Sequence, residues 1–167
     1  MQLPSELGAV TYTHVCYLTD DLDQSLAAFA ALGVKETERV EFGSGVYAIV
    51  ELPGFANYGS PTSGAPMRIE LLMPTSEGNV YSDHLARHGK GLHHIGILVP
   101  DFEQYLEAFT AAGCKVMVDA RQPASSAVNG TREAKSKDGW MDRNPTYQMC
   151  YLDCSAIGFP TVEMVSY

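Results

Sequence analysis

"HVCYLTDDLDQSLAAFAALGVKE" (residues 14–36) and "HIGILVPDFEQYLEAFTAAGCKV" (residues 94–116) are two copies of one pattern. Aligned without a gap, the segments share ten identical residues, among them the leading histidines, His14 and His94. Self-similarity over this length indicates a duplicated structural unit rather than a chance match. The chain is therefore predicted to contain two copies of one module.

Each copy begins with an apolar run that predicts a strand, followed by a helix. Asp21 and Asp101 are typical N-cap residues, and Gly33 and Gly113 are placed to end the two helices. Three further strands follow in each half, so each module is predicted to be βαβββ in an α+β protein. The predicted strands are 12–18, Arg39–Phe42, Val46–Leu52, Met67–Met73, 92–99, Lys115–Ala120, Tyr147–Asp153 and Thr161–Ser166.

The predicted organisation is a single domain built from both modules. Residues 1–75 form the first module, and residues 92–167 form the second. Residues 76–91 form a linker with a short helix at Ser82–His88. The polar segment 121–146 has no hydrophobic periodicity and is expected to be a loop inserted into the second module.

Composition excludes several classes of function. The chain has 167 residues and a net charge of −9, which argues against binding to nucleic acid or to an anionic membrane surface. No apolar run approaches the ~20 residues of a membrane helix, and the N-terminus lacks the features of a signal peptide. The four cysteines lie in apolar runs without the density of a disulfide scaffold, which predicts reduced thiols in a cytoplasmic protein.

Strand alternation separates the paired histidines of "GLHHIGILVPD" (residues 91–101). His93 shares its face with apolar residues that suit packing under the helix, whereas His94 faces the other side, beside Gly96. The repeat superposes His14 on His94, so His94 is predicted to be functional and His93 structural.

Two glutamates stand inside apolar strands, Glu70 in "MRIELLM" and Glu163 in "PTVEMVS". A carboxylate buried without a partner is very costly, so each is expected to have one. Each glutamate lies in the last strand of its module, as each histidine lies in the first. Two histidines and two carboxylates disposed by a duplication have the ligand chemistry of a divalent-metal site. Exposed glutamates with two unrelated histidines are the alternative interpretation.

The repeat, "RIELLMPTSEG", "GKGLHHIGILVPDFEQYLEAFTAAGCKV" and "GFPTVEMV" together resemble the vicinal oxygen chelate superfamily, in its glyoxalase I and methylmalonyl-CoA epimerase branch. The resemblance covers about residues 10–120 and 147–167. It implies that the tandem modules form a curved, partly open, barrel-like mixed sheet around a metal cavity. One divalent ion per chain (Zn, Ni, Co, Mn or Fe) would be held by His14, Glu70, His94 and Glu163. Epimerases of this type often have glutamine at the second position, so this set is more similar to glyoxalase I. A homodimer is expected.

The resemblance also points to one departure. The epimerases carry a catalytic glutamate on the third strand of the first module. Aligned on the turn that follows this strand, the corresponding position here is Ala48, which is expected to face the cavity. Glu51 lies three residues on and is expected to face the other way, which makes it a poor substitute. The remaining candidates for the base are Glu163 and Glu70, either of which could leave the metal and take a proton. Tyr47, Tyr147 and Tyr151 are candidate acids, and Tyr47 would need a one-residue bulge to reach the cavity.

Three classes of function follow from the resemblance. The preferred class is a metal-dependent isomerase, epimerase or lyase acting on a small-molecule carbonyl substrate, through an enolate or enediolate at the carbon beside the carbonyl. A ring-cleaving Fe(II) dioxygenase of the extradiol type is the second, and a fourth protein ligand, Glu70, argues against it. A non-catalytic small-molecule-binding protein is the third, and the complete ligand set disfavours it.

The insert gathers cations in an acidic chain. It contains Arg121, Arg132 and Arg143, together with Trp140, the one tryptophan of the sequence. In the family topology such a loop lies near the mouth of the metal cavity. It is predicted to close over an anionic or aromatic substrate. A solvated loop with no role in catalysis is the alternative.

Overall fold

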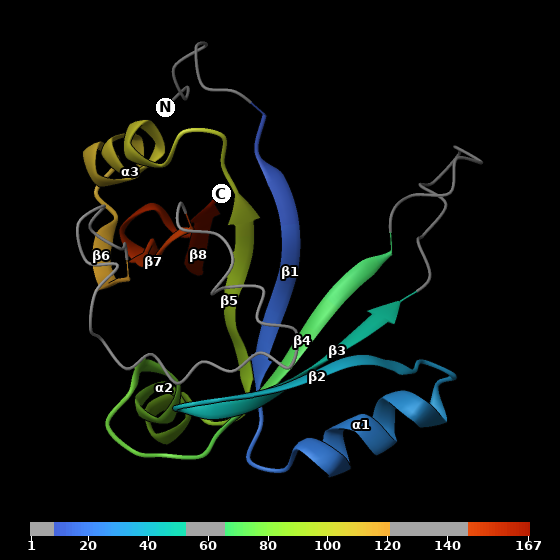
Figure 1. Cartoon of the computed structure of the whole chain (residues 1–167). Helices are drawn as coiled ribbons and strands as arrows, with labels where there is room; N and C mark the ends of the chain where they lie inside the picture. The colour runs from blue at the N-terminus through green and yellow to red at the C-terminus, as the bar shows by residue number, and fades with distance from the viewer. Residues whose placement is uncertain (1–8, 53–65, 121–146) are drawn as a thin grey trace, which may run out of the picture. The chain divides into compact units, whose positions relative to one another are not determined.

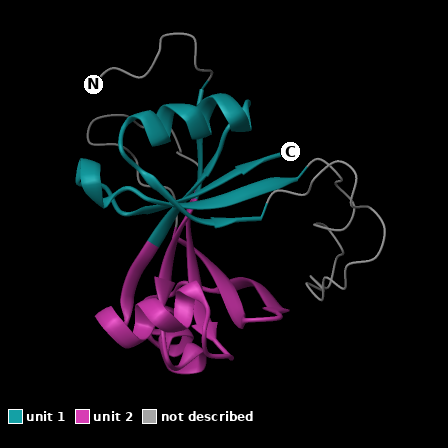
Figure 2. Cartoon of the chain, turned by 90° about the vertical axis from the view of Figure 1, so that its left-hand side faces the viewer, with its two compact units in different colours: residues 1–13, 94–167 teal, residues 14–93 magenta. Residues whose placement is uncertain are grey.

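The computed structural model describes residues 9–52, 66–120 and 147–167 (Figure 1). Within these residues the elements follow the order strand, helix and three strands, twice, with one helix between the copies. The predicted α+β class and the paired βαβββ modules are therefore confirmed. The chain divides into two compact units, residues 14–93 and residues 1–13 with 94–167 (Figure 2).

The first unit contains a four-stranded mixed sheet in the order β2-β3-β4-β1. Strand β1 pairs parallel with β4, and the other pairs are antiparallel. Helix α1 contacts β3 and β4. The bounds are β1 (Thr11–Leu18), α1 (Leu22–Ala31), β2 (Glu36–Phe42), β3 (Gly45–Leu52), β4 (Met67–Pro74) and α2 (Val80–His88).

The second unit repeats this plan in the order β5-β8-β7-β6, again with one parallel pair, β5 with β8. A short 3-10 helix, η2, precedes the last strand. The bounds are β5 (Gly91–Leu98), α3 (Phe102–Ala111), β6 (Lys115–Asp119), β7 (Gln148–Asp153), η2 (Ser155–Ile157) and β8 (Thr161–Ser166).

The core of the second unit lies between the sheet and α3. Phe102 and Tyr105 of α3 pack against Val99, Leu152 and Met164. Each of these side chains is at most 2% exposed. The side chains on this face of β7 and β8 alternate with Tyr151 and Glu163, which therefore lie on the other face of the sheet.

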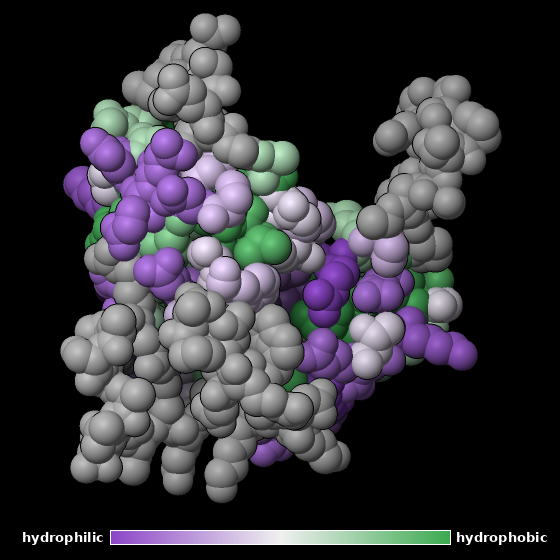
Figure 3. Space-filling model, turned by 45° about the horizontal axis from the view of Figure 1, so that its top comes forward, coloured by the Kyte–Doolittle hydropathy of each residue, from purple (hydrophilic) through white to green (hydrophobic). Residues whose placement is uncertain are grey.

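The four thiols are part of the packed interior. Cys16, Cys114, Cys150 and Cys154 are buried, and none of the four forms a disulfide. Burial and a hydrogen bond with Cys114 raise the pKa of the Cys154 thiol, which favours its neutral form. The described surface mixes hydrophilic and hydrophobic side chains on the face in Figure 3. None of the helices in the described residues has the length and apolar character needed to cross a membrane.

Both repeat helices begin as predicted. Asp21 Oδ1 accepts a hydrogen bond from the Gln24 amide at 2.9 Å, and Asp101 Oδ1 accepts one from the Gln104 amide at 3.0 Å. Each carboxylate accepts a hydrogen bond from a first-turn amide that has no acceptor within the helix. The cap is therefore an inherited feature of the duplicated module.

Removing one cap gives a stability prediction. Asp101→Ala is expected to lower the free energy of unfolding by about 1 kcal/mol, because the first turn of α3 loses its side-chain acceptor. Asp101→Asn is the matched control and is expected to stay near wild type, since asparagine caps equally well. Urea denaturation of the three proteins measures the difference. Equal losses for the two variants would contradict the capping role.

Candidate functional site

The first His–Glu pair lies within residues 14–93. His14 is on β1 and Glu70 is on β4, and the parallel ladder places Glu70 opposite Cys16, two residues beyond His14. His14 Nε2 lies 3.0 Å from Glu70 Oε2, and the side chains are 14% and 11% exposed. The carboxylate in the apolar strand thus has the partner that its burial requires.

The second His–Glu pair lies within the other unit and repeats the first. His94 is on β5, and Glu163 on β8 is opposite Gly96, again two residues beyond the histidine. His94 Nε2 lies 3.6 Å from Glu163 Oε2, with side chains that are 0% and 15% exposed. The four predicted ligands therefore lie as two His–Glu pairs, one within each unit.

Tyr151 supports the second pair. Its hydroxyl donates a hydrogen bond to Glu163 Oε1 at 3.0 Å. Its ring meets the His94 ring edge-on, with centroids 5.1 Å apart. Tyr151 is opposite Glu163 in the β7–β8 ladder, where the first module has Ile49 opposite Glu70. The sequence offered Tyr151 only as one of three candidate acids. The structure shows it holding one carboxylate oxygen.

The third strand presents different residues to the site than expected. In the β3–β4 ladder Ile49 is opposite Glu70, so Tyr47 and Glu51 share the face of Glu70. Ala48 is opposite Leu71 and faces the other side of the sheet. The premise that position 48 faces the ligands is therefore wrong, and Tyr47 needs no bulge to reach that face. Glu51 is the glutamate that β3 places there.

Glu51 belongs to a cluster of charged residues beside Glu70. Arg68 Nε lies 3.6 Å from Glu51 Oε1, and Arg68 Nη2 lies 3.3 Å from Glu38 Oε2. The Tyr47 hydroxyl donates to Glu38 Oε1 at 3.4 Å. Of the predicted catalytic residues, Tyr47 is thus directed toward Glu38, and its ring packs against the cluster of Cys16, Leu18 and Leu72.

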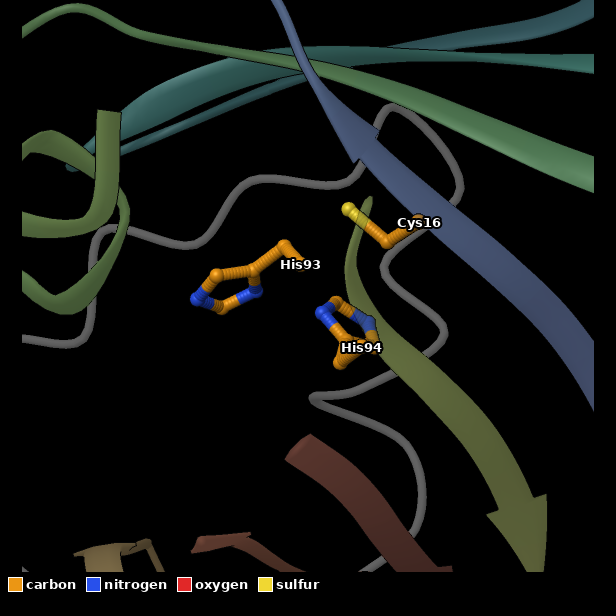
Figure 4. Close-up of side chains that lie close together, drawn as sticks. All are labelled: Cys16, His93 and His94. Carbon is orange, nitrogen blue, oxygen red and sulfur yellow. The ribbon is translucent and has the colours of Figure 1, made fainter. Parts of the chain in front are cut away.

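His93 is enclosed by aromatic rings of α2. It is 3% exposed, and its centroid lies 5.4 Å from Tyr81 and 4.8 Å from His84. This packing fits the structural role predicted for His93. Figure 4 shows His93 with Cys16, whose sulfur lies within 4.8 Å of a His93 ring nitrogen, and with His94, the next residue of β5. Sequence analysis missed Cys16, although it shares strand parity with His14.

Tyr147 and the insert complete the set of predicted site residues. Tyr147 is buried and its ring stacks on Tyr167, with centroids 5.9 Å apart. The predicted substrate-loop residues lie outside the described residues, so the loop hypothesis stays a prediction. These residues are Arg121, Arg132, Trp140 and Arg143.

The donor atoms of the two pairs suit a divalent ion of the first transition row or zinc. Each pair offers an imidazole nitrogen and a carboxylate oxygen, the donors that these ions accept. Glu163 also has a supporting contact, the hydrogen bond from Tyr151. The donor chemistry of each pair therefore fits the predicted metal.

The sequence matches the family model described as the Glyoxalase/Bleomycin resistance protein/Dioxygenase superfamily over residues 13–134. The chain belongs to this superfamily, as the repeat and the ligand pattern predicted. No curated protein sequence matches the chain.

Solved structures share the fold at low sequence identity. A variant of methylmalonyl-CoA epimerase from Streptomyces coelicolor, in complex with 2-nitronate-propionyl-CoA, is 18% identical with a TM-score of 0.61, covering 93% of this chain and 95% of that one. Methylmalonyl-CoA epimerase from Mycobacterium tuberculosis is 17% identical with a TM-score of 0.58, covering 99% and 92%. A hypothetical protein from Bacillus halodurans C-125 is 17% identical with a TM-score of 0.64, covering 96% of each chain. These likenesses establish the fold.

Proposed function

We propose that the chain is a divalent-metal-dependent isomerase, epimerase or lyase that acts at a carbon adjacent to a carbonyl. The observation that carries this proposal is the repeated His–Glu pair, at 3.0 Å in one module and 3.6 Å in the other. Structural packing alone gives no reason to place an imidazole against a carboxylate at the same position of both copies. A shared set of metal ligands would explain why the pair is repeated.

His14, Glu70, His94 and Glu163 would hold the ion. When bound, the ion would supply Lewis-acid stabilisation of negative charge on the substrate oxygen. Tyr151 keeps one oxygen of Glu163 in a hydrogen bond and so sets the direction in which the other oxygen points. This arrangement makes Glu163 a well-positioned ligand.

Glu51 is the proposed base. It lies on the face of Glu70, two residues along β3 from the position opposite that ligand. Its side chain is 36% exposed, and Arg68 holds it at 3.6 Å. A carboxylate oxygen that is held in place and does not face an imidazole can accept a proton from an acidic C–H. Glu163 and Glu70, the bases favoured by the sequence, are each paired with a histidine.

The substrate class follows from this chemistry and from the relatives. The reaction requires a carbonyl compound with an acidic C–H beside the carbonyl. Methylmalonyl-CoA is such a compound, and a methylmalonyl-CoA epimerase of this fold has been solved with it. We propose a substrate of this kind and take methylmalonyl-CoA as the first probe. The expected homodimer and cytoplasmic location stay predictions.

Proton exchange tests the function. Metal-loaded protein incubated with the probe in D₂O is expected to incorporate deuterium at the carbon beside the thioester, as measured by ¹H NMR. No oxygen should be consumed. Stoichiometric consumption of oxygen during turnover of any carbonyl or catechol substrate would contradict the proposal and favour the dioxygenase class.

Tyr151→Phe tests how Glu163 is held. The variant keeps the ring against His94 and loses the hydroxyl, so metal affinity is expected to fall about 10- to 100-fold while the fold is kept. Competition with a chromogenic chelator measures the affinity. Tyr47→Phe is the control, because its hydroxyl is bonded to Glu38. Equal affinity for Tyr151→Phe and wild type would show that the hydrogen bond does not position a ligand.

A further inference from the structure

Helix α2 carries two histidines outside the two His–Glu pairs. His84 and His88 are four residues apart and so lie on one face of the helix. Their ring centroids are 4.6 Å apart. His88 is exposed at the last helical residue, and His84 is half-buried beneath it. The pair is thus open to solvent on one side and enclosed on the other.

Residues at the start of β5 hold the His84 ring in place. It donates a hydrogen bond to the Leu92 carbonyl, at the start of β5. It also meets the buried His93 ring edge-on at 4.8 Å. An imidazole has two nitrogens, and the bond to Leu92 uses one of them. Metal-binding histidines are commonly fixed in this way, by a carbonyl that accepts a bond from the nitrogen not used for the metal.

The local electrostatics also favour a cation. Burial and the neighbouring His88 lower the pKa of His84, which favours the neutral imidazole that metals require. The two nearby basic side chains are engaged, since Arg87 lies 3.7 Å from Asp83 and Lys90 lies 2.6 Å from Asp20. The C-terminal end of a helix carries partial negative charge.

We propose that His84 and His88 form a second, peripheral site for a borderline divalent transition ion such as Cu²⁺, Ni²⁺ or Zn²⁺. Imidazole is a preferred ligand of these ions, and two histidines at this spacing on a helix are a known way of binding zinc. Water completes the coordination. Because structural sites use about four protein ligands, two imidazoles give a weaker and exchangeable site. An ion there would join the last turn of α2 to the start of β5, through the bond from His84 to Leu92.

Paramagnetic NMR with Cu²⁺ alone tests this site directly. Cu²⁺ titrated into ¹⁵N-labelled protein is expected to broaden the backbone amides of Val80–His88. In His88→Ala the same broadening should need at least about tenfold more Cu²⁺, the lower end of what loss of a supporting group costs a metal site. Arg87→Ala removes a neighbouring exposed side chain without removing an imidazole and should behave as wild type.

The outcomes separate the peripheral site from the His–Glu pairs. Amides of β4 and β8 report on the pairs, whereas the difference between wild type and His88→Ala along α2 reports on the peripheral site, so failure of one proposal is distinguishable from failure of the other. Absence of broadening along α2 in the wild type, or equal broadening in His88→Ala, would overturn the proposal. His88→Gln is a second variant that keeps a polar side chain and should match His88→Ala.

Discussion

His94→Ala is expected to abolish stoichiometric binding of a divalent ion and to reduce turnover to background. The His94 side chain is fully buried and its Nε2 faces Glu163. Alanine therefore removes one of the four proposed ligands. Elemental analysis of dialysed protein measures the ion content, and the D₂O exchange assay measures turnover.

His93→Ala is the matched control for this prediction. His93 is the adjacent residue, is also buried and packs against Tyr81 and His84. It should keep the ion while losing stability, because a packed ring is replaced by a cavity. Circular dichroism confirms that both variants remain folded. Loss of the ion in His93→Ala with retention in His94→Ala would reverse the assignment of the two histidines.

Glu51→Gln is expected to keep the ion and to lower the exchange rate about 10²- to 10⁴-fold, the range that general-base catalysis contributes. Glutamine preserves the shape of the side chain and its contact with Arg68, and it removes the basic oxygen. Glu38→Gln is the matched control, because Glu38 also lies beside Arg68. It should retain most of the activity.

Two results would contradict the role of Glu51 as the base. If Glu51→Gln exchanges deuterium at the wild-type rate, the base lies elsewhere, and Glu163, as first predicted from the sequence, becomes the leading candidate. If both glutamine variants lose activity equally, activity depends on the charged cluster around Arg68 as a unit. Glu51 is then a positioning residue and not the base.

The secondary structure was predictable where local signals agreed with the tertiary environment. The N-caps at Asp21 and Asp101 and the strand Thr161–Ser166 were predicted at their observed positions. Helix α2 begins at Val80, before the predicted Ser82, because Asn79 caps it. The Ser82 hydroxyl in turn accepts a hydrogen bond from the Asn79 backbone amide. Strand β2 begins at Glu36, before the predicted Arg39. Its first residues are polar and exposed and include an irregularity, so they lack the alternation that marks a strand.

Part of the evidence for the candidate site lay within single strands. Parity within β5 predicted a functional His94 and a structural His93, because Ile97 and Val99 mark the apolar face. That assignment stays a prediction, since ring nitrogens of the two histidines lie within 4.8 Å of each other. Parity in β3 was set by alignment to the following turn, and it placed Ala48 on the wrong face. Hydrogen bonding to β4 determines that face, and no residue of β3 alone reveals it. The contact between Tyr151 and Glu163 likewise depends on the register of two strands.

We propose that the two His–Glu pairs bind one shared ion. The most direct test is a crystal structure of protein loaded with Zn²⁺ or Ni²⁺, with anomalous data collected at the absorption edge of that metal. We expect one anomalous peak at about 2.0–2.2 Å from donor atoms of His14, Glu70, His94 and Glu163. A peak bound by only one pair, separate peaks at each pair, or no peak at either pair would contradict it.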